Sequence, residues 1–169
     1  MRPRLAGEFM RATVYHLDFE GAILERGFWV YVWKIVPRDG HLLYYVGKTG
    51  DKASGVSQSA FDRLSKHVGH NKYNNALRRH LSKAGIDPAT CRFTFHAWGP
   101  LFHHSARRHR DLCDVTSALE KGLADSLVAG GYSVINRVTC RTPLDEKLFA
   151  DLRSAFIKQF PKLGRGTDH

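Results

Sequence analysis

The segment 44–50, with the sequence YYVGKTG, offers two kinds of chemistry, because a tripeptide typical of phosphate-binding loops follows two tyrosines. Gly47, Lys48 and Thr49 have the residue types that end a P-loop, which holds nucleotide phosphates with backbone N–H groups and a lysine. Such a loop also needs a glycine five positions before Gly47, and that position is Leu42. The sequence therefore disfavours a nucleotide-hydrolysing P-loop protein.

Tyrosines on two neighbouring strands are the other candidate. Residues 28–36 are rich in aromatic and β-branched side chains, residues 37–40 have turn composition, and residues 42–46 predict the returning strand. Tyr31 and Tyr45 would then lie on adjacent antiparallel strands and could face one cleft. Taken alone, a tyrosine on such a strand is more often a core residue with a satisfied hydroxyl.

A helix predicted at residues 59–68 would position two further polar side chains. Ser59 and Asp62 have the spacing of a capping box at its start. Arg63 and His67 are four residues apart, so they lie on one side of the helix, beside its apolar stripe. Side chains at such a border can point into a cleft, although a solvated arginine and a partly buried histidine are the commoner outcome.

An acidic side chain on a later helix could supply a metal ligand. Glu120 lies beside Leu119 and Leu123, which mark the buried stripe of a helix predicted at residues 114–129. One carboxylate, completed by phosphate oxygens and water, suits Mg²⁺, although most helical glutamates lie on the surface. Asn136 follows this helix, where a turn residue is also common.

The order of these residues resembles the GIY-YIG endonuclease family over residues 28–138. Trp29-Val30-Tyr31 stands where the family has Gly-Ile-Tyr, and Tyr45-Val46-Gly47 stands where it has Tyr-Ile-Gly. The first glycine is thus replaced by Trp29. The family then has a catalytic arginine, in some members a histidine one turn later, a metal-binding glutamate and an asparagine, which match Arg63, His67, Glu120 and Asn136.

The resemblance implies a catalytic role for each of these residues. Tyr31 is favoured as the base that activates water and Tyr45 as the hydroxyl that orients phosphate, with the reverse assignment left open. A free phenol has a pKa near ~10, so it needs positive charge nearby, and Lys48 and Arg63 are candidate sources. Arg63 would also bind the scissile phosphate through hydrogen bonds from its guanidinium. His67 would hydrogen-bond the phosphate or the attacking water.

The resemblance further implies a metal and a reaction. Glu120 would hold Mg²⁺ or Mn²⁺, and Asn136 would orient the phosphate or a metal-bound water. The expected activity is hydrolysis of DNA phosphodiester bonds, in restriction, phage defence or DNA processing. The alternative is a basic module that binds nucleic acid and has no catalytic activity.

The net charge of the chain favours a polyanionic partner. Lys and Arg number 26 against 16 acidic residues, a formal net charge of +10. This excess favours DNA as the partner, with RNA left open, over a membrane surface, because the basic residues do not gather on one long amphipathic helix. A merely soluble basic protein remains an alternative. The side chains expected to contact the phosphate backbone are Arg78, Arg79, His80, Lys83, Arg107, Arg108 and Arg110.

The remaining patterns predict a mixed α/β fold of the α+β kind, with a small three-stranded antiparallel sheet flanked by helices. Further strands are predicted at residues 12–20 and 92–98, and further helices at residues 75–83 and 142–160. No linker is long enough to divide the chain, so residues 1–169 are expected to form one domain.

Within that domain, residues 1–27 would be an N-terminal extension with a strand, residues 28–138 the nuclease-like core, and residues 139–169 an amphipathic helix and tail. The three cysteines are widely spaced and lack a CxxC pattern. Such a sparse, odd count favours reduced thiols in a cytoplasmic protein.

Overall fold

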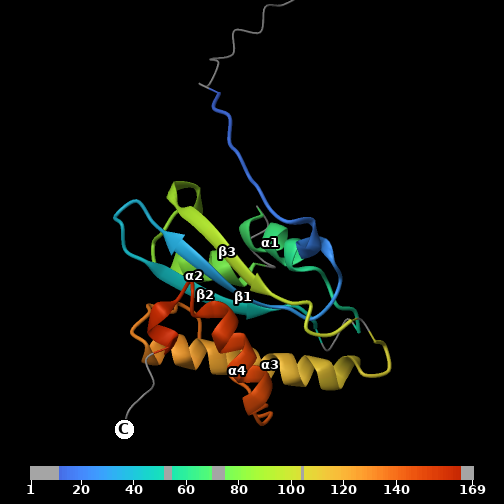
Figure 1. Ribbon diagram of the computed structural model, residues 1–169. Helices are drawn as coiled ribbons and strands as arrows, with labels where there is room; N and C mark the ends of the chain where they lie inside the picture. Colours follow the sequence, from blue (N-terminus) through green and yellow to red (C-terminus); the bar gives the residue numbers. More distant parts are fainter. Residues whose placement is uncertain (1–11, 52–54, 70–74, 104, 165–169) are drawn as a thin grey trace, which may run out of the picture.

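The computed structural model describes residues 12–51, 55–69, 75–103 and 105–164. Figure 1 shows a mixed α/β fold in which a three-stranded sheet lies between helices, as the sequence predicts. In chain order the described elements are β1 (Val30–Val36), β2 (Leu43–Lys48), α1 (Ala60–Val68), α2 (Ala76–Lys83), β3 (Arg92–Trp98), α3 (His109–Ala129) and α4 (Glu146–Phe156). Short 3₁₀ turns lie at Gly21–Leu24, Pro88–Thr90 and Pro161–Gly164.

The sheet has the order β2-β1-β3, and both strand pairs are antiparallel. In the β1–β2 register, Tyr31 lies opposite Gly47 and Trp33 lies opposite Tyr45. The outer edge of β2 is covered, because Tyr44 forms a parallel bridge with Val134. The central strand β1 is almost wholly buried, since elements pack on both of its faces.

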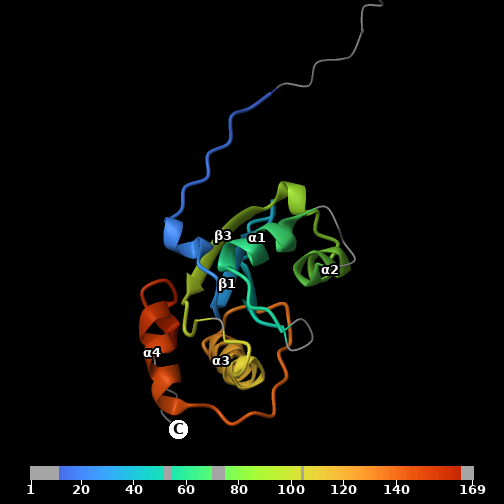
Figure 2. The ribbon, with the colours of Figure 1, turned by 90° about the vertical axis from the view of Figure 1, so that its right-hand side faces the viewer.

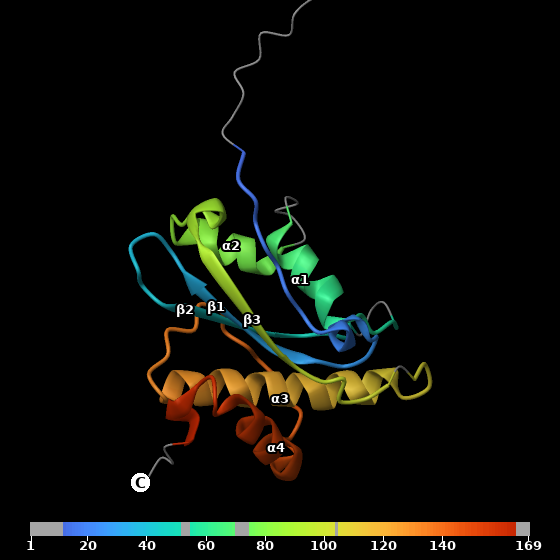
Figure 3. The same cartoon turned by 45° about the horizontal axis from the view of Figure 1, so that its top comes forward.

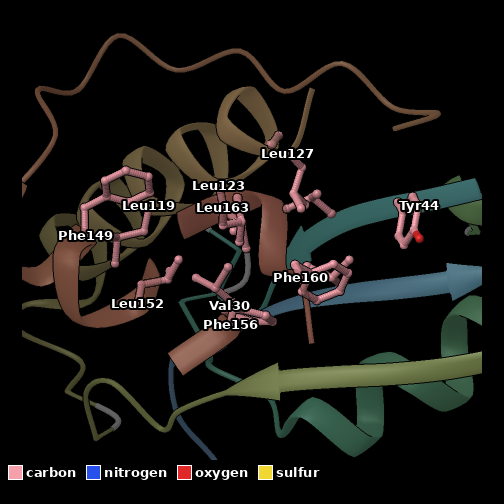
Figure 4. Close-up of a cluster of buried hydrophobic side chains, with 13 residues drawn as sticks. Val30, Tyr44, Leu119, Leu123, Leu127, Phe149, Leu152, Phe156, Phe160 and Leu163 are labelled. Carbon is pink, nitrogen blue, oxygen red and sulfur yellow. The ribbon is translucent and has the colours of Figure 1, made fainter. Parts of the chain in front are cut away.

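Helices cover both faces of the sheet (Figure 2), and each face carries its own core. On one face, Tyr31, Trp33 and Tyr45 pack with Leu77 and Leu81 of α2. The other face packs against α3 and α4 (Figure 4). Its buried side chains include Val30, Tyr44, Leu119, Leu123, Leu127, Phe149, Leu152, Phe156, Phe160 and Leu163. Each fully buried side chain of this size contributes about 1.5–3 kcal/mol, so these layers fix β1 and β2 firmly.

N-terminal caps fix where α1 and α2 begin, and these two helices lie on the face of the sheet that carries Tyr31 and Tyr45. Ser59 and Asp62 form the predicted capping box, in which each side chain accepts a hydrogen bond from the other residue's backbone N–H. Asn75 caps α2, because its side chain accepts from the backbone N–H of Arg78. Such caps satisfy amide groups that a helix start leaves unpaired.

The predicted strand at residues 12–20 is wrong. The segment forms no strand, and Val14 and Tyr15 are 96% and 89% exposed. Its alternating pattern is compatible with a strand, but a strand needs a hydrogen-bonded neighbour, and the described residues provide none for it.

Two predicted helices also have wrong boundaries. The helix expected at residues 142–160 is the shorter α4, because Asp145 caps it by accepting from the N–H of Leu148. Pro143 therefore lies before the helix rather than in its first turn. Helix α3 begins at His109, five residues before the expected start. No helix among the described residues is long and apolar enough to cross a membrane.

Candidate active site

Two strands and one helix bring the predicted tyrosines and histidine together. The Tyr31 hydroxyl on β1 lies 2.8 Å from Nε2 of His67 on α1. The His67 ring also contacts Tyr45 on β2, with 5.3 Å between ring centroids. Tyr31 is fully buried, while Tyr45 and His67 retain slight exposure. The three side chains thus form one cluster beneath α1.

Gly47 makes room for this cluster. It lies opposite Tyr31 in the sheet, and a Cβ atom built on it would be only 2.5 Å from the Tyr31 hydroxyl oxygen. A side chain at this position would therefore displace the tyrosine. Gly47 thus gives the Tyr31 ring the space it needs. This is a reason for a glycine at position 47 that does not involve phosphate binding.

We expect Gly47→Ala to destabilise the protein by about 1–3 kcal/mol, the usual effect of overpacking a filled core. Urea unfolding followed by circular dichroism measures the change. Gly21→Ala is the matched control, because nothing lies within 4 Å of a Cβ at Gly21. Equal stability of the two variants would show that Tyr31 does not occupy the space beside Gly47.

Charged side chains from α1 and α3 act on the tyrosines. Burial raises the pKa of Tyr45 to about 12; the negative charge of Glu120 adds to this rise, and the positive charge of Arg63 opposes it. Burial likewise raises the pKa of Tyr31, while the Arg63 charge lowers it, as does a hydrogen bond from Arg63. Both phenols are therefore protonated near neutral pH.

Glu120 and His67 have pKa values displaced in opposite directions. Burial raises the pKa of Glu120 to about 7, although the positive charges of Lys48 and Arg63 lower it. Burial and the Arg63 charge lower the pKa of His67 to about 4. At neutral pH the histidine is therefore uncharged, and the carboxyl lies near the midpoint of its titration. Such shifts are common at functional sites, where burial and charge partners are combined.

Two buried polar atoms at the site have no hydrogen-bond partner. They are Nε of Arg63 and Nδ1 of His67. Buried polar atoms are nearly always paired with protein or water, so each such exception asks for an explanation. An anion or a water bound between α1 and the tyrosines would supply acceptors to both atoms.

Lys48 and Asn136 both contact backbone in the structure. Nζ of Lys48 donates to the carbonyl oxygen of Gly50 at 2.6 Å, yet its charge still acts on Glu120. The Asn136 amide accepts from the N–H of Val46 at 3.0 Å and donates to its carbonyl at 2.8 Å. Asn136 therefore ties the segment after α3 to the edge of β2, beside Tyr45.

The predicted phosphate-contacting residues fall into two groups. Arg79 and Lys83 are exposed on α2, and the Arg79 charge lowers the pKa of Tyr45. Arg78 instead donates to the carbonyl of Gly69, so it supports the end of α1. The second group lies at the start of α3 and is exposed: Arg107, Arg108 and Arg110. Arg110 precedes Glu120 by ten residues, about 15 Å along a helix.

Two further residues lie at the site: Asn75, which the sequence did not single out, and His80, which it placed among the residues expected to contact the phosphate backbone rather than beside Tyr45. The His80 ring on α2 lies 5.9 Å from the Tyr45 ring, which makes α2 a wall of the cluster. Asn75 donates to the carbonyls of Lys66 and His67 and so fixes the turn that holds His67. The signal for Asn75 was available, because asparagine before a helix is a preferred cap. Nothing in the sequence pairs His80 with Tyr45.

The residues present fit a metal held mainly by substrate and water. Among the described residues, no three His, Cys, Asp or Glu side chains gather to form a metal site. Glu120 supplies one partly buried carboxylate, which interacts electrostatically with Arg63 and the tyrosines. A single carboxylate is compatible with Mg²⁺, which keeps much of its water and takes further oxygens from bound phosphate.

Comparison with known proteins adds no relative. No family model, curated protein or solved structure matches the chain.

Proposed function

We propose that this chain is a divalent-metal-dependent DNA endonuclease of GIY-YIG type, which hydrolyses phosphodiester bonds. One observation carries the proposal. Tyr31, Tyr45, Arg63 and His67 form one mostly buried cluster, on which the charge of Glu120 from α3 acts. These residues are far apart in the sequence, and each has a role in the resemblance that suggested them.

Substrate binding would begin with phosphate at Arg63. Its planar guanidinium suits bidentate contact with phosphate oxygens, and its Nε has no partner in the ligand-free protein. Arg79 and Lys83 extend the positive charge along α2. The net charge of +10 would attract DNA to the protein, and these two side chains would bind it on this side of the sheet.

Proton transfer would pass through Tyr31 and His67. When Nδ1 of His67 carries the ring hydrogen, Nε2 can accept the hydrogen of the Tyr31 hydroxyl, 2.8 Å away. Water attacking phosphorus would give its proton to Tyr31 as the phenolic proton moves to His67. The P–O bond to the leaving oxygen would break, that oxygen would take a proton from solvent water, and His67 would return its extra proton to solvent. A bound phosphate would also raise the low pKa of His67, because the negative charge of the phosphate would offset the positive charge of Arg63.

Glu120 would hold the metal. A bound Mg²⁺ or Mn²⁺ supplies Lewis-acid stabilisation of the charge that develops on phosphate oxygens. The Glu120 carboxyl must lose its proton to bind the ion, and its pKa of about 7 places that loss near neutral pH. Lys48, whose charge acts on Glu120, favours the ionised form.

The deciding experiment is incubation of purified protein with supercoiled plasmid, with Mg²⁺, with Mn²⁺ and with EDTA. Metal-dependent conversion to nicked or linear plasmid is the expected result. Absence of cleavage with every divalent metal, together with tight DNA binding, would instead favour the basic binding module. One observation favours that second candidate, because Tyr31 is fully buried and its pKa is raised.

DNA binding is expected to weaken steeply as salt rises, because phosphate contacts release counterions. Arg79→Ala with Lys83→Ala should make the plot of log affinity against log salt shallower by about 2. The control is Lys147→Ala with Lys158→Ala, which removes the same charge from exposed positions in or just after α4, across the sheet. Fluorescence anisotropy measures the DNA affinity of each double variant across the salt range. If the two double variants have the same slope, α2 is not part of the DNA-binding surface.

A further inference from the structure

The two edges of the sheet differ. The outer edge of β2 is covered by the segment that carries Val134, whereas among the described residues β3 pairs only with β1. An uncovered strand edge presents unpaired N–H and C=O groups and is a template for another strand. The outer edge of β3 is therefore the place where this sheet can accept a further strand.

A groove of about 460 Å³ runs along this edge. Its floor includes Ala97 and Trp98 of β3, one wall is the segment 18–23, and the other wall is α4 with Ala155 and Phe156. The lining is mixed, with apolar side chains such as Phe156 beside polar ones such as His96 and Gln159. These are the features with which a sheet edge binds an extended peptide, by main-chain hydrogen bonds and side-chain pockets.

The segment 12–17 has the properties of the missing strand. Its side chains alternate, and it exposes large apolar groups, with Leu17 68% exposed in addition to Val14 and Tyr15. Six residues extend about 20 Å, which matches the seven residues of β3. The segment runs away from the body of its own chain (Figures 1 and 3). It leaves from residue 18, where the wall of the groove begins.

Charge does not oppose a second copy as the partner. Residues 12–17 contain no Asp, Glu, Lys or Arg, in a chain of net charge +10. The segment of one copy can therefore meet the body of another without the repulsion that two basic surfaces would have.

We infer that residues 12–17 of one copy add as a strand to the β3 edge of a second copy. In a closed two-fold dimer each copy gives one strand and accepts one, so both grooves are filled. The exchange covers the exposed apolar side chains of the segment and pairs the backbone of β3. It is independent of the proposed nuclease activity.

Light scattering after size exclusion tests the exchange through the molar mass of the full chain. We expect wild type to have twice the mass of one chain. Tyr15→Asp with Leu17→Asp, which changes only exposed side chains, should reduce it to that of one chain. Val128→Asp is the control, because Val128 is 58% exposed and lies outside the groove.

Blocking the groove gives the reciprocal test. Ala155→Arg should reduce the mass in the same way, because Ala155 is exposed and lines the groove. Ser154→Arg is its control, being exposed on α4 but outside the groove. Mixing the segment variant with Ala155→Arg should restore a dimer, since one intact segment then meets one intact groove. A single-chain mass for wild type, or a dimer that neither variant disturbs, would overturn the inference.

Discussion

Glu120→Gln is expected to reduce plasmid cleavage by orders of magnitude while the protein stays folded. The amide keeps the size of the side chain but loses the charge that would hold the metal. Lewis-acid stabilisation of the phosphate is worth several kcal/mol, so its loss removes most of the rate. DNA binding measured in EDTA should persist or strengthen slightly, because a negative charge near Arg63 has gone.

Asp125→Asn is the matched control for this substitution. It makes the same chemical change on α3, but Asp125 is exposed and forms an ion pair with Lys121. Cleavage by this variant should equal that of wild type, as is usual for surface substitutions. If Glu120→Gln also cuts at the wild-type rate, Glu120 is not the metal ligand.

The pH dependence of stability provides a test of Glu120 that does not need activity. Its pKa is about 7 in the folded protein, above the unfolded value of 4.5. The folded state therefore binds a proton more tightly, and the stability from that proton is present below the unfolded pKa and lost as pH rises through about 7. His67 titrates in both proteins, so its contribution cancels in the comparison.

Glu120→Gln lacks this titration. Its melting temperature relative to wild type should therefore rise between about pH 5 and about pH 8. Differential scanning fluorimetry across that range measures the difference. A difference that does not change with pH would show that Glu120 is solvated in the folded state, and would argue against the partly buried carboxylate without bearing on the nuclease proposal as a whole.

The sequence predicted the β1–β2 hairpin and the start of α1, because both depend on residues close together in the chain. The aromatic and β-branched run around Tyr31 gave the hairpin, and the spacing of Ser59 and Asp62 gave the start of α1. Both signals act within a few residues, through β-propensity and through a cap. The hydrogen bond between Tyr31 and His67 was not predicted by these signals, because strand alternation and helix periodicity show which residues share a side of one element but not which elements meet.

Contacts between distant segments could not be predicted in the same way. The bonds of Asn136 to Val46 depend on how the segment after α3 returns to β2, which no local pattern encodes. The segment 12–20 has a strand pattern but no strand, because pairing depends on a partner rather than on its own sequence. Arg78 and Arg79 are adjacent basic residues, yet helix geometry points them to different neighbours.

Tyr31→Phe and Tyr45→Phe are each expected to reduce cleavage by about 10²–10⁴-fold, the usual contribution of a positioned acid or base. Each change keeps the ring and removes one hydroxyl. The two variants should differ in stability. Tyr31→Phe leaves Nε2 of the buried His67 without its partner, which costs about 1–3 kcal/mol.

Tyr44→Phe is the control that separates catalysis from loss of a tyrosine hydroxyl in general. Tyr44 lies next to Tyr45 on β2 but faces the other core, where its ring packs with Tyr132 and Phe160. Plasmid cleavage and urea unfolding, measured for all three variants, give the comparison. Tyr44→Phe should cut normally, while the other two lose activity far beyond any loss of stability. Normal cutting by both Tyr31→Phe and Tyr45→Phe would make these tyrosines core residues, and the active cluster would have to be sought elsewhere.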